Sequence, residues 1–206
     1  MSFRVLGLSG SLRAGSVNTR LLEAYAAAAP PGIAVERFDL RDLPVYDAGR
    51  DDLAGGDGPP PAVAALRAAI AGSDALLLVG PEHNWSYAAV LKAAIDWSSR
   101  PKGCSVLAGR PVALGGASPG AGGTVRAQEH LRQVLASVRA EVLAEPVVAL
   151  GNATAGEDWP GPAVELLARQ LEALRRLAPA SPRADGAAAS PQAASSARSR
   201  PSSLAA

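Results

Sequence analysis

The stretch DALLLVGPEHNWSYAAVLKAAIDW, residues 74–97, combines a buried strand, a polar turn and an amphipathic helix within a short length of chain. Residues 74–79 form a continuous apolar run, which is typical of a central parallel strand that helices cover on both faces. Residues 88–98 have the apolar spacing of a helix. The turn between them carries a proline, an acid, a histidine, an asparagine and a tryptophan, where a plain connector needs only glycine, aspartate or serine. The stretch therefore predicts a parallel α/β sheet with a functional loop after a central strand.

The same alternation of strand and helix extends over most of the chain. Further strand patterns lie at residues 3–8, 33–38, 111–115 and 142–150, and further helix patterns lie at 18–28, 62–71, 124–138 and 161–177. Strands that alternate with helices indicate βαβ units and a parallel sheet. We expect an α/β domain over residues 1–178 with a parallel sheet.

The loop after the first strand, within GLSGSLRAGSVNTRLL (residues 7–22), carries groups that bind phosphate. Ser11 and Ser16 offer hydroxyls, Arg13 a guanidinium and Asn18 an amide, all at the start of a helix whose unpaired N–H groups favour an anion. The loop matches neither GxGxxG nor the GK[ST] of a P-loop, which favours a mononucleotide over a pyrophosphate. Capping of the helix by Ser16 or Asn18 is the structural alternative, but it explains only one of these residues.

A third loop, within GGASPGAGGTVRAQEHLRQVL (residues 115–135), follows the fourth strand and is rich in glycine. Its glycines allow another molecule to approach the backbone closely, and Ser118 adds a hydroxyl. In an open α/β sheet, ligands bind outside the carboxyl ends of the strands at the point where the strand order reverses. We expect the loops after strands one, three and four to converge there.

Composition excludes several other classes of protein. The chain has 206 residues, 48% of them hydrophobic and 19% charged, which is typical of a globular domain. Its formal net charge of +1 gives no electrostatic case for binding nucleic acid or an anionic membrane. No run approaches the roughly 18 apolar residues of a transmembrane helix, and no signal peptide opens the chain. The single cysteine, Cys104, fits a reducing compartment, so we expect a cytoplasmic protein.

Two segments do not fit the alternating pattern. Residues 43–61, with the cluster GGDGPPP, are expected to form a long exposed loop. Residues 179–206 consist mainly of Ala, Ser, Pro and Arg, and a segment with so few large apolar side chains cannot offset the entropy cost of ordering. We expect this tail to be disordered.

Three motifs together resemble the NADPH-dependent FMN reductase family of flavodoxin-like quinone, azo-dye and chromate reductases. They are GSLRAGSVN, PEHNWSYAAVLKAAIDWSSRP and GRPVALGGASPGAGGTVRAQEHLRQVL, and DLRDLPVYDA is similar to the segment that these proteins carry after their second strand. The resemblance covers residues 3–178 in the right order. It implies a flavodoxin-like doubly wound sheet of five parallel strands in the order 2-1-3-4-5 with helices on both faces. It also implies bound FMN, NADPH or NADH as electron donor, a small-molecule electron acceptor, and assembly as a homodimer or homotetramer.

The resemblance also assigns residues to the cofactor. The first loop holds the FMN phosphate and the turn after the third strand lies along the flavin ring, which explains why that turn is polar and aromatic. The implied FMN-binding residues are Ser11, Arg13, Ser16, Val17, Asn18, Pro81, Glu82, His83, Asn84, Ser118 and Gly120. No side chain is assigned a catalytic role and no metal site is expected, because the flavin supplies the redox chemistry.

The chain departs from the family pattern at four positions. His83 replaces the usual tyrosine, Ala88 and Ala89 replace the common Pro-Gly, and Ala93 replaces the usual asparagine. Two functions therefore remain open. One is an oxidoreductase that passes electrons to a quinone, free flavin, azo dye or metal oxyanion. The other is a flavin-binding carrier or partner subunit with little turnover, although a carrier of the flavodoxin type is usually acidic and this chain is not.

Overall fold

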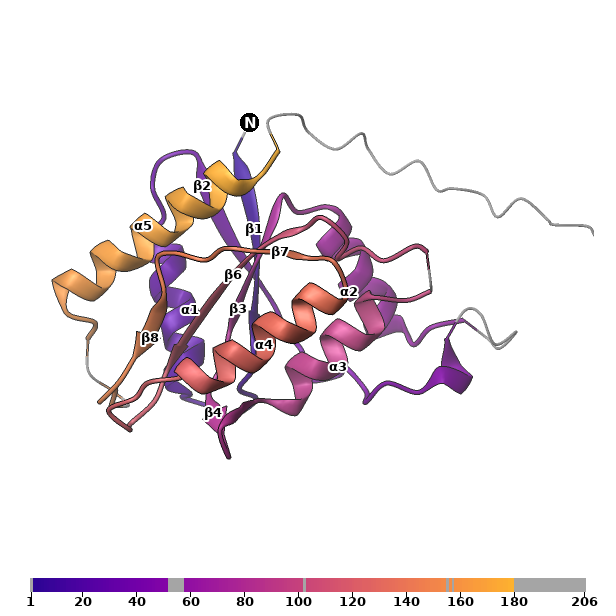
Figure 1. Ribbon diagram of the computed structural model, residues 1–206, viewed down its shortest axis with the longest axis horizontal. Helices are drawn as coiled ribbons and strands as arrows, with labels where there is room; N and C mark the ends of the chain where they lie inside the picture. Colours follow the sequence, from indigo (N-terminus) through magenta and orange to yellow (C-terminus); the bar gives the residue numbers. More distant parts are fainter. Residues whose placement is uncertain (1, 52–57, 102, 155, 157, 180–206) are drawn as a thin grey trace, which may run out of the picture.

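A parallel β-sheet forms the centre of the molecule. The computed structural model describes residues 2–51, 58–101, 103–154, 156 and 158–179. Its strands run in the order β2-β1-β3-β6-β7, β8 also pairs with β6, and every pairing in this sheet is parallel (Figure 1). The strands are β1 (Phe3–Ser9), β2 (Ile33–Phe38), β3 (Ala75–Val79), β6 (Pro111–Ala117), β7 (Glu141–Val142) and β8 (Val148–Leu150). Counting β7 and β8 as one strand position, the predicted order 2-1-3-4-5 is confirmed.

Helices cover both faces of the sheet, as predicted (Figure 1). Helices α1 (Val17–Ala27) and α5 (Gly161–Leu177) pack on one face. The other face carries α2 (Pro61–Ala71), α3 (Ala89–Ser98) and α4 (Val125–Ser137). Among the described residues, no helix is both long and apolar enough to span a membrane.

The central strand β3 contributes alternate side chains to two separate cores. Leu76 and Leu78 pack with the side chains of α2, α3 and α4, whereas Leu77 and Val79 pack with those of α1 and α5. All of these residues are at most 2% exposed. Because successive side chains of a strand point to opposite faces, a strand buried on both faces needs an unbroken apolar sequence, which ALLLV provides.

The fifth strand differs from the sequence prediction. A continuous strand was expected over residues 142–150, but β7 pairs with Pro111 and Val112 of β6, and β8 pairs further along with Gly115 to Ala117. Pro146 lies between the two pieces. Proline has no N–H to donate to the strand ladder, so the pairing stops there and resumes beyond it.

Val45 and residues 47–50, in the segment after β2, are exposed, as predicted for a loop, but other side chains anchor this segment to the fold. Leu43 packs in the core of the α2, α3 and α4 face, and the Tyr46 ring lies edge-on to Trp97 with centroids 4.8 Å apart. A short 3-10 helix, η1 (Ala48–Arg50), follows, and the Asp51 carboxylate is 3.3 Å from the Arg67 guanidinium. Residues 52–57, which include the first three residues of the glycine and proline cluster at 55–61, lie outside the described residues, as do residues 180–206, all but the start of the predicted tail.

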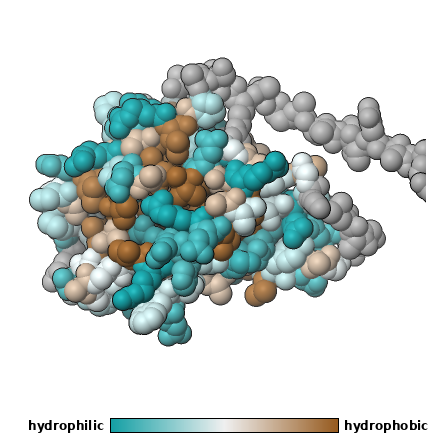
Figure 2. All heavy atoms as spheres, in the orientation of Figure 1, coloured by the Kyte–Doolittle hydropathy of each residue, from teal (hydrophilic) through white to brown (hydrophobic). Residues whose placement is uncertain are grey.

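Apolar side chains are unevenly distributed over the visible surface. Figure 2 shows them gathered between α5 and α4, over the edge of the sheet where β7 and β8 lie. Val147 and Val164 in this region are each 37% exposed. The carboxyl ends of β1, β3 and β6 lie elsewhere and are lined by more polar loops.

Candidate functional site

The loops after β1, β3 and β6 meet at the carboxyl edge of the sheet, as predicted. The Gly10 N–H donates to the Val79 carbonyl at 2.7 Å, and the Gly80 N–H donates to the Gly115 carbonyl at 3.0 Å. A Cβ atom on Gly10 would lie 2.8 Å from the Leu91 side chain and 3.3 Å from the Gly80 Cα. The strand ends therefore approach backbone to backbone, at the point between β1 and β3 where the strand order reverses.

Ser16 caps helix α1. Its hydroxyl accepts a hydrogen bond from the Asn18 N–H at 3.2 Å, and its side chain is buried. This is the capping role that the sequence left open as an alternative for Ser16 or Asn18. The cap fixes the helix start beneath the first loop, so the positive end of the helix dipole points toward Arg13 and its neighbours.

Asn18 connects the first loop to the third. Its amide nitrogen donates to the Ala117 carbonyl and its amide oxygen accepts from the Ala117 N–H, both at 2.9 Å. Asn18 is 2% exposed, and both polar atoms of its side chain are used by these bonds. The structure therefore gives Asn18 a positioning role between the loops, and a direct phosphate contact by its side chain stays a prediction.

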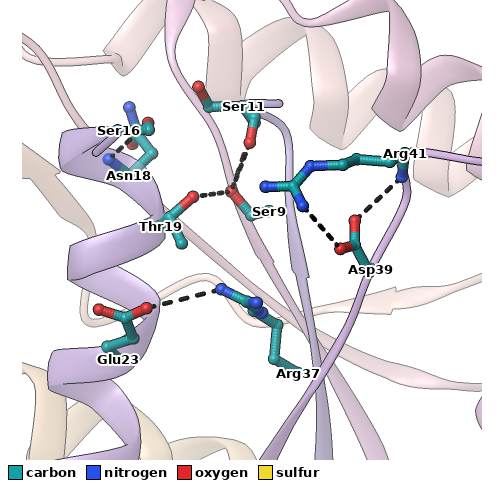
Figure 3. Close-up of polar contacts among 9 residues, drawn as sticks. All are labelled: Ser9, Ser11, Ser16, Asn18, Thr19, Glu23, Arg37, Asp39 and Arg41. Carbon is teal, nitrogen blue, oxygen red and sulfur yellow. Dashed lines mark hydrogen bonds and ion pairs between the residues drawn. The ribbon is translucent and has the colours of Figure 1, made fainter. Parts of the chain in front are cut away.

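The outer part of the first loop lines a cavity of about 300 Å³ between α1 and the end of β2. The hydroxyls of Ser9 and Thr19 are 3.1 Å apart, and the Ser9 hydroxyl donates to the Ser11 carbonyl at 3.4 Å (Figure 3). Arg13 is exposed, and among the described residues its guanidinium makes no hydrogen bond or ion pair. A free guanidinium beside several hydroxyls matches the donor set that a phosphate monoester requires.

The turn after β3 is a tight hairpin, which the sequence analysis did not predict. Strands β4 (Glu82–His83) and β5 (Ser86–Tyr87) pair antiparallel across the two residues Asn84 and Trp85. Both have positive φ, 50° and 63°, as the two central residues of a type I′ turn require. Asparagine tolerates this conformation and was the available signal, but tryptophan rarely adopts it. His83 is exposed and Trp85 is 66% exposed, so the hairpin presents two rings at the surface.

Glu82 holds the hairpin against helix α4. One carboxylate oxygen accepts from the Ala127 N–H at 3.1 Å, and the other lies 3.7 Å from the Arg126 guanidinium. Arg126 in turn lies over the Trp85 ring, 4.6 Å from its centroid. The sequence placed Glu82 at the cofactor, and this carboxylate instead satisfies an N–H in the first turn of α4. A contact between Glu82 and the flavin stays a prediction.

The glycine-rich third loop packs against the segment after β8. The Ser118 N–H donates to the Leu150 carbonyl, and the Ala153 N–H donates back to the Ser118 carbonyl, both at 2.9 Å. Gly123 has a φ of 60°, and a Cβ there would lie 2.7 Å from the Ala149 carbonyl oxygen. Part of the glycine content is therefore explained by packing within the protein. Residues 150–153 carry no motif of their own, so this fourth loop was not predicted.

Tyr87, at the end of the hairpin, keeps its phenolic proton. Burial is the largest cause that raises the pKa of the Tyr87 phenol, and Lys92 opposes it. The Tyr87 hydroxyl is therefore neutral at ordinary pH and can donate a hydrogen bond. Among the described residues, no group of three or more His, Cys, Asp or Glu side chains could hold a metal ion.

The sequence is similar to those of known reductases over most of its length. Residues 3–155 match the profile of a family described as NADPH-dependent FMN reductase. The chain is 43% identical over 177 residues to the NAD(P)H-dependent FMN reductase of Pseudomonas aeruginosa. This match covers 84% of this chain and 93% of that protein. It is 40% identical over 146 residues to a 2-hydroxy-1,4-benzoquinone reductase of a Burkholderia species, covering 71% of this chain and 77% of that one.

A solved structure with lower sequence identity shares the fold. The flavoenzyme NAD(P)H:(acceptor) oxidoreductase FerB of Paracoccus denitrificans superimposes with a TM-score of 0.74 at 28% sequence identity. The match covers 85% of this chain and 98% of that protein.

Proposed function

The chain belongs to the NADPH-dependent FMN reductase family and is an FMN-dependent NAD(P)H oxidoreductase, and we propose that it passes electrons to a quinone. The convergence of the loops after β1, β3 and β6 carries this proposal, because it builds one site from a phosphate-binding loop and an aromatic hairpin. Quinone reductases among the similar proteins support the choice of acceptor. Free flavins, azo dyes and metal oxyanions are the other acceptors to compare.

The residues at this edge fit the two chemically different ends of FMN. Arg13, the Ser11 hydroxyl and the N-terminus of α1 suit the phosphate, and Val17 begins that helix behind its Ser16 cap. Pro81, His83 and Asn84 of the hairpin suit the ring, since peptide groups can bond to its edge and side-chain rings can lie against its face. We assign Ser118 and Gly120 of the third loop to the same cofactor.

Bound FMN supplies the two-electron chemistry, and the protein residues bind and orient it. Arg13 neutralises the phosphate and Asn18 fixes the distance between the first and third loops. Glu82 holds the hairpin against α4, so the hairpin has a defined position beside the ring. We assign no side chain of the site a role in proton transfer.

An anaerobic redox titration tests the proposed function. The FMN-loaded protein is mixed with NADPH under argon and its flavin absorbance is followed, and 1,4-benzoquinone is then added. We expect rapid bleaching by NADPH and full recovery of the absorbance with the quinone. Rapid bleaching without quinone-dependent recovery would contradict the proposed acceptor. A flavin that NADPH does not bleach would instead support the carrier or partner-subunit alternative suggested by His83, Ala88 and Ala89.

We also propose that the protein is a cytoplasmic homodimer or homotetramer. The single cysteine supports a reducing compartment. Trp85 and Val125 support an interface near the hairpin, since they are 66% and 54% exposed and belong to two elements that Arg126 joins. Light scattering during size-exclusion chromatography measures the mass directly, and a monomer at micromolar concentration would contradict the oligomer.

A further inference from the structure

One face of helix α5 borders a groove on the surface of the molecule. The groove has a volume of about 520 Å³ and lies between α5 and the connection from β7 to β8, where Glu145 and Pro146 line it. Val147 follows Pro146 and Val164 lies on α5, and each of these valines is 37% exposed. Figure 2 shows apolar side chains gathered over this region. Exposed apolar groups around a groove indicate a surface at which another molecule binds.

Six residues of α5 form the helix face beside this groove, in two rows at the four-residue spacing of helix ridges. One row is Glu165, Arg169 and Ala173, and the other is Ala168, Glu172 and Arg176. All of them except Glu165 line the groove. Ala168 and Ala173 are only partly buried, and side chains this small allow a second helix to approach closely.

The charges of this face alternate in sign along the helix, in the order Glu165, Arg169, Glu172 and Arg176. Within the described part of the chain, the Glu165, Arg169 and Arg176 side chains form no ion pair. The Glu172 carboxylate lies 2.6 Å from the Arg175 guanidinium, but these side chains are 29% and 40% exposed, so the pair is weak and the carboxylate remains open to a second cation. The face therefore fits a partner whose charges follow the complementary order.

Helix α5 itself, read in the opposite direction, has that complementary order. A twofold axis beside the middle of residues 165–176 places Arg169 opposite Glu172 of the partner subunit. The same axis places Glu165 opposite Arg176 of the partner subunit, and the alanines of the two copies face each other. Because a twofold interface is self-complementary, each of these contacts occurs twice. In a parallel pair, by contrast, each charged residue would meet its own copy and repel it.

We propose that α5 forms an antiparallel interface with α5 of a second copy of this chain. The inference rests on the homo-oligomer proposed above and gives it a second interface. The hairpin with Trp85 contacts α4 on one face of the sheet, whereas α5 covers the opposite face. Two different twofold interfaces on one chain produce a tetramer of D2 symmetry, and one alone produces a dimer. We therefore expect the protein to be a tetramer.

Charge reversal tests this interface without nicotinamide or an electron acceptor. The mass of the FMN-loaded protein is measured by light scattering during size-exclusion chromatography, over a dilution series at low ionic strength. Arg169→Glu and Glu172→Arg each bring like charges together at two symmetry-related contacts, so each variant should be a dimer where the unsubstituted protein is a tetramer. We expect each substitution to raise the dissociation constant of the tetramer into dimers by roughly 10- to 100-fold.

Mixing the two single variants provides the decisive measurement. Arg169→Glu in one copy then faces Glu172→Arg in the other, so opposite charges meet again and an equimolar mixture should recover the tetramer mass. A chain that carries both substitutions should be a tetramer as well. Recovery by charge exchange requires these two positions to face each other between copies, and a loss of folding cannot produce it.

The matched control is Arg50→Glu, which reverses an exposed arginine of η1 and should leave the tetramer intact. Melting temperature and flavin content verify that each variant is folded. An unchanged mass for both single α5 variants would overturn the proposal, as would a mixture that stays dimeric. A dimeric protein that becomes monomeric with Arg169→Glu would support the α5 interface and overturn the one at the hairpin. A monomeric protein would overturn both interfaces, while bleaching of the flavin by NADPH tests the electron transfer separately.

Discussion

Asn18 illustrates how one residue type serves two different roles. The sequence places it in a phosphate-binding motif, yet both polar atoms of its side chain bond to the Ala117 backbone. A buried amide with both of its groups satisfied is a rigid connector between loops. The distinction could not be made from sequence, because Ala117 lies 99 positions away and carries no side-chain signal.

Asn18→Ala separates the two roles. Loss of the amide leaves a buried N–H and a buried carbonyl of Ala117 without partners, which should lower the free energy of unfolding by roughly 2–4 kcal/mol. Because the two loops are then no longer connected, FMN and riboflavin should both bind more weakly. Chemical denaturation and flavin titration measure these effects. A loss of FMN affinity alone, with unchanged stability, would mean that Asn18 contacts the phosphate directly.

Tyr25 is a buried phenol that makes stability depend on pH. It is fully buried, its hydroxyl donates to the Gln170 side chain, and burial raises the pKa of Tyr25 well above its ordinary value. Above pH of about 10 the unfolded chain loses this proton while the folded protein retains it. The unfolded state then binds fewer protons, so the free energy of unfolding falls as the pH rises.

Tyr25→Phe should reduce this alkaline loss of stability and lower stability at neutral pH. The Gln170 oxygen loses its donor, and an unsatisfied buried acceptor costs about 1–3 kcal/mol. Urea denaturation of both proteins between pH 7 and 11 measures the difference. Tyr46 and Tyr87 also have raised pKa values and remain in the variant, so only the difference between the curves reports on Tyr25. Parallel curves would contradict the argument.

At the scale of elements, the Glu82 carboxylate is one of three side-chain contacts between the hairpin and α4, beside the Arg126–Trp85 and His130–Ser86 contacts. Glu82 accepts from the Ala127 N–H, and its side chain is 14% exposed. The charge is also favourable there because it faces the positive end of the helix dipole. Glu82 is thus a capping residue that comes from a different element than the helix it caps.

Glu82→Ala should destabilise the protein by about 1–2 kcal/mol, the effect of losing a helix cap. Glu82→Gln keeps an acceptor for the Ala127 N–H but loses the charge, so it should cost about half as much. Thermal denaturation of both, with Glu129→Ala as an exposed control on the same helix, provides the measurement. Equal losses for Ala and Gln would show that the charge, rather than the hydrogen bond, holds the hairpin.

Most elements could be predicted because their patterns are local. The apolar run of β3 and the spacing of α5 give the type of element and nearly its ends. The hairpin was missed since each of its strands has two residues, too few for alternation to appear. The break between β7 and β8 could have been found, because Pro146 stands inside the expected strand.

At the scale of the whole molecule, the parallel sheet followed from the alternation of strands and helices, and the strand order followed from the resemblance to the reductase family. Right-handed crossovers and the reversal of strand order leave few arrangements for such a chain. Two features could not be predicted from this pattern: the packing of the third loop against residues 150–153, and the cavity beside β2. Both depend on side chains and backbone groups brought together across the fold, for which the sequence has no periodic signal.

The carboxyl-terminal boundary of the domain gives a prediction at this scale. Helix α5 ends at Leu177, and its last fully buried side chain is Leu174, which packs in the same core as Leu171 and the side chains of α1. Truncation after Pro179 removes none of this core, so the melting temperature and the flavin content should stay unchanged. Truncation after Gln170 removes Leu171 and Leu174, at about 2–5 kcal/mol each for buried leucines. That loss approaches the whole stability of a domain, about 5–15 kcal/mol, so the shorter chain should not fold. Circular dichroism during heating and the ratio of flavin to protein absorbance measure both results. A clear drop in melting temperature for the chain ending at Pro179 would show that residues 180–206 stabilise the domain, contrary to the proposed boundary near residue 178.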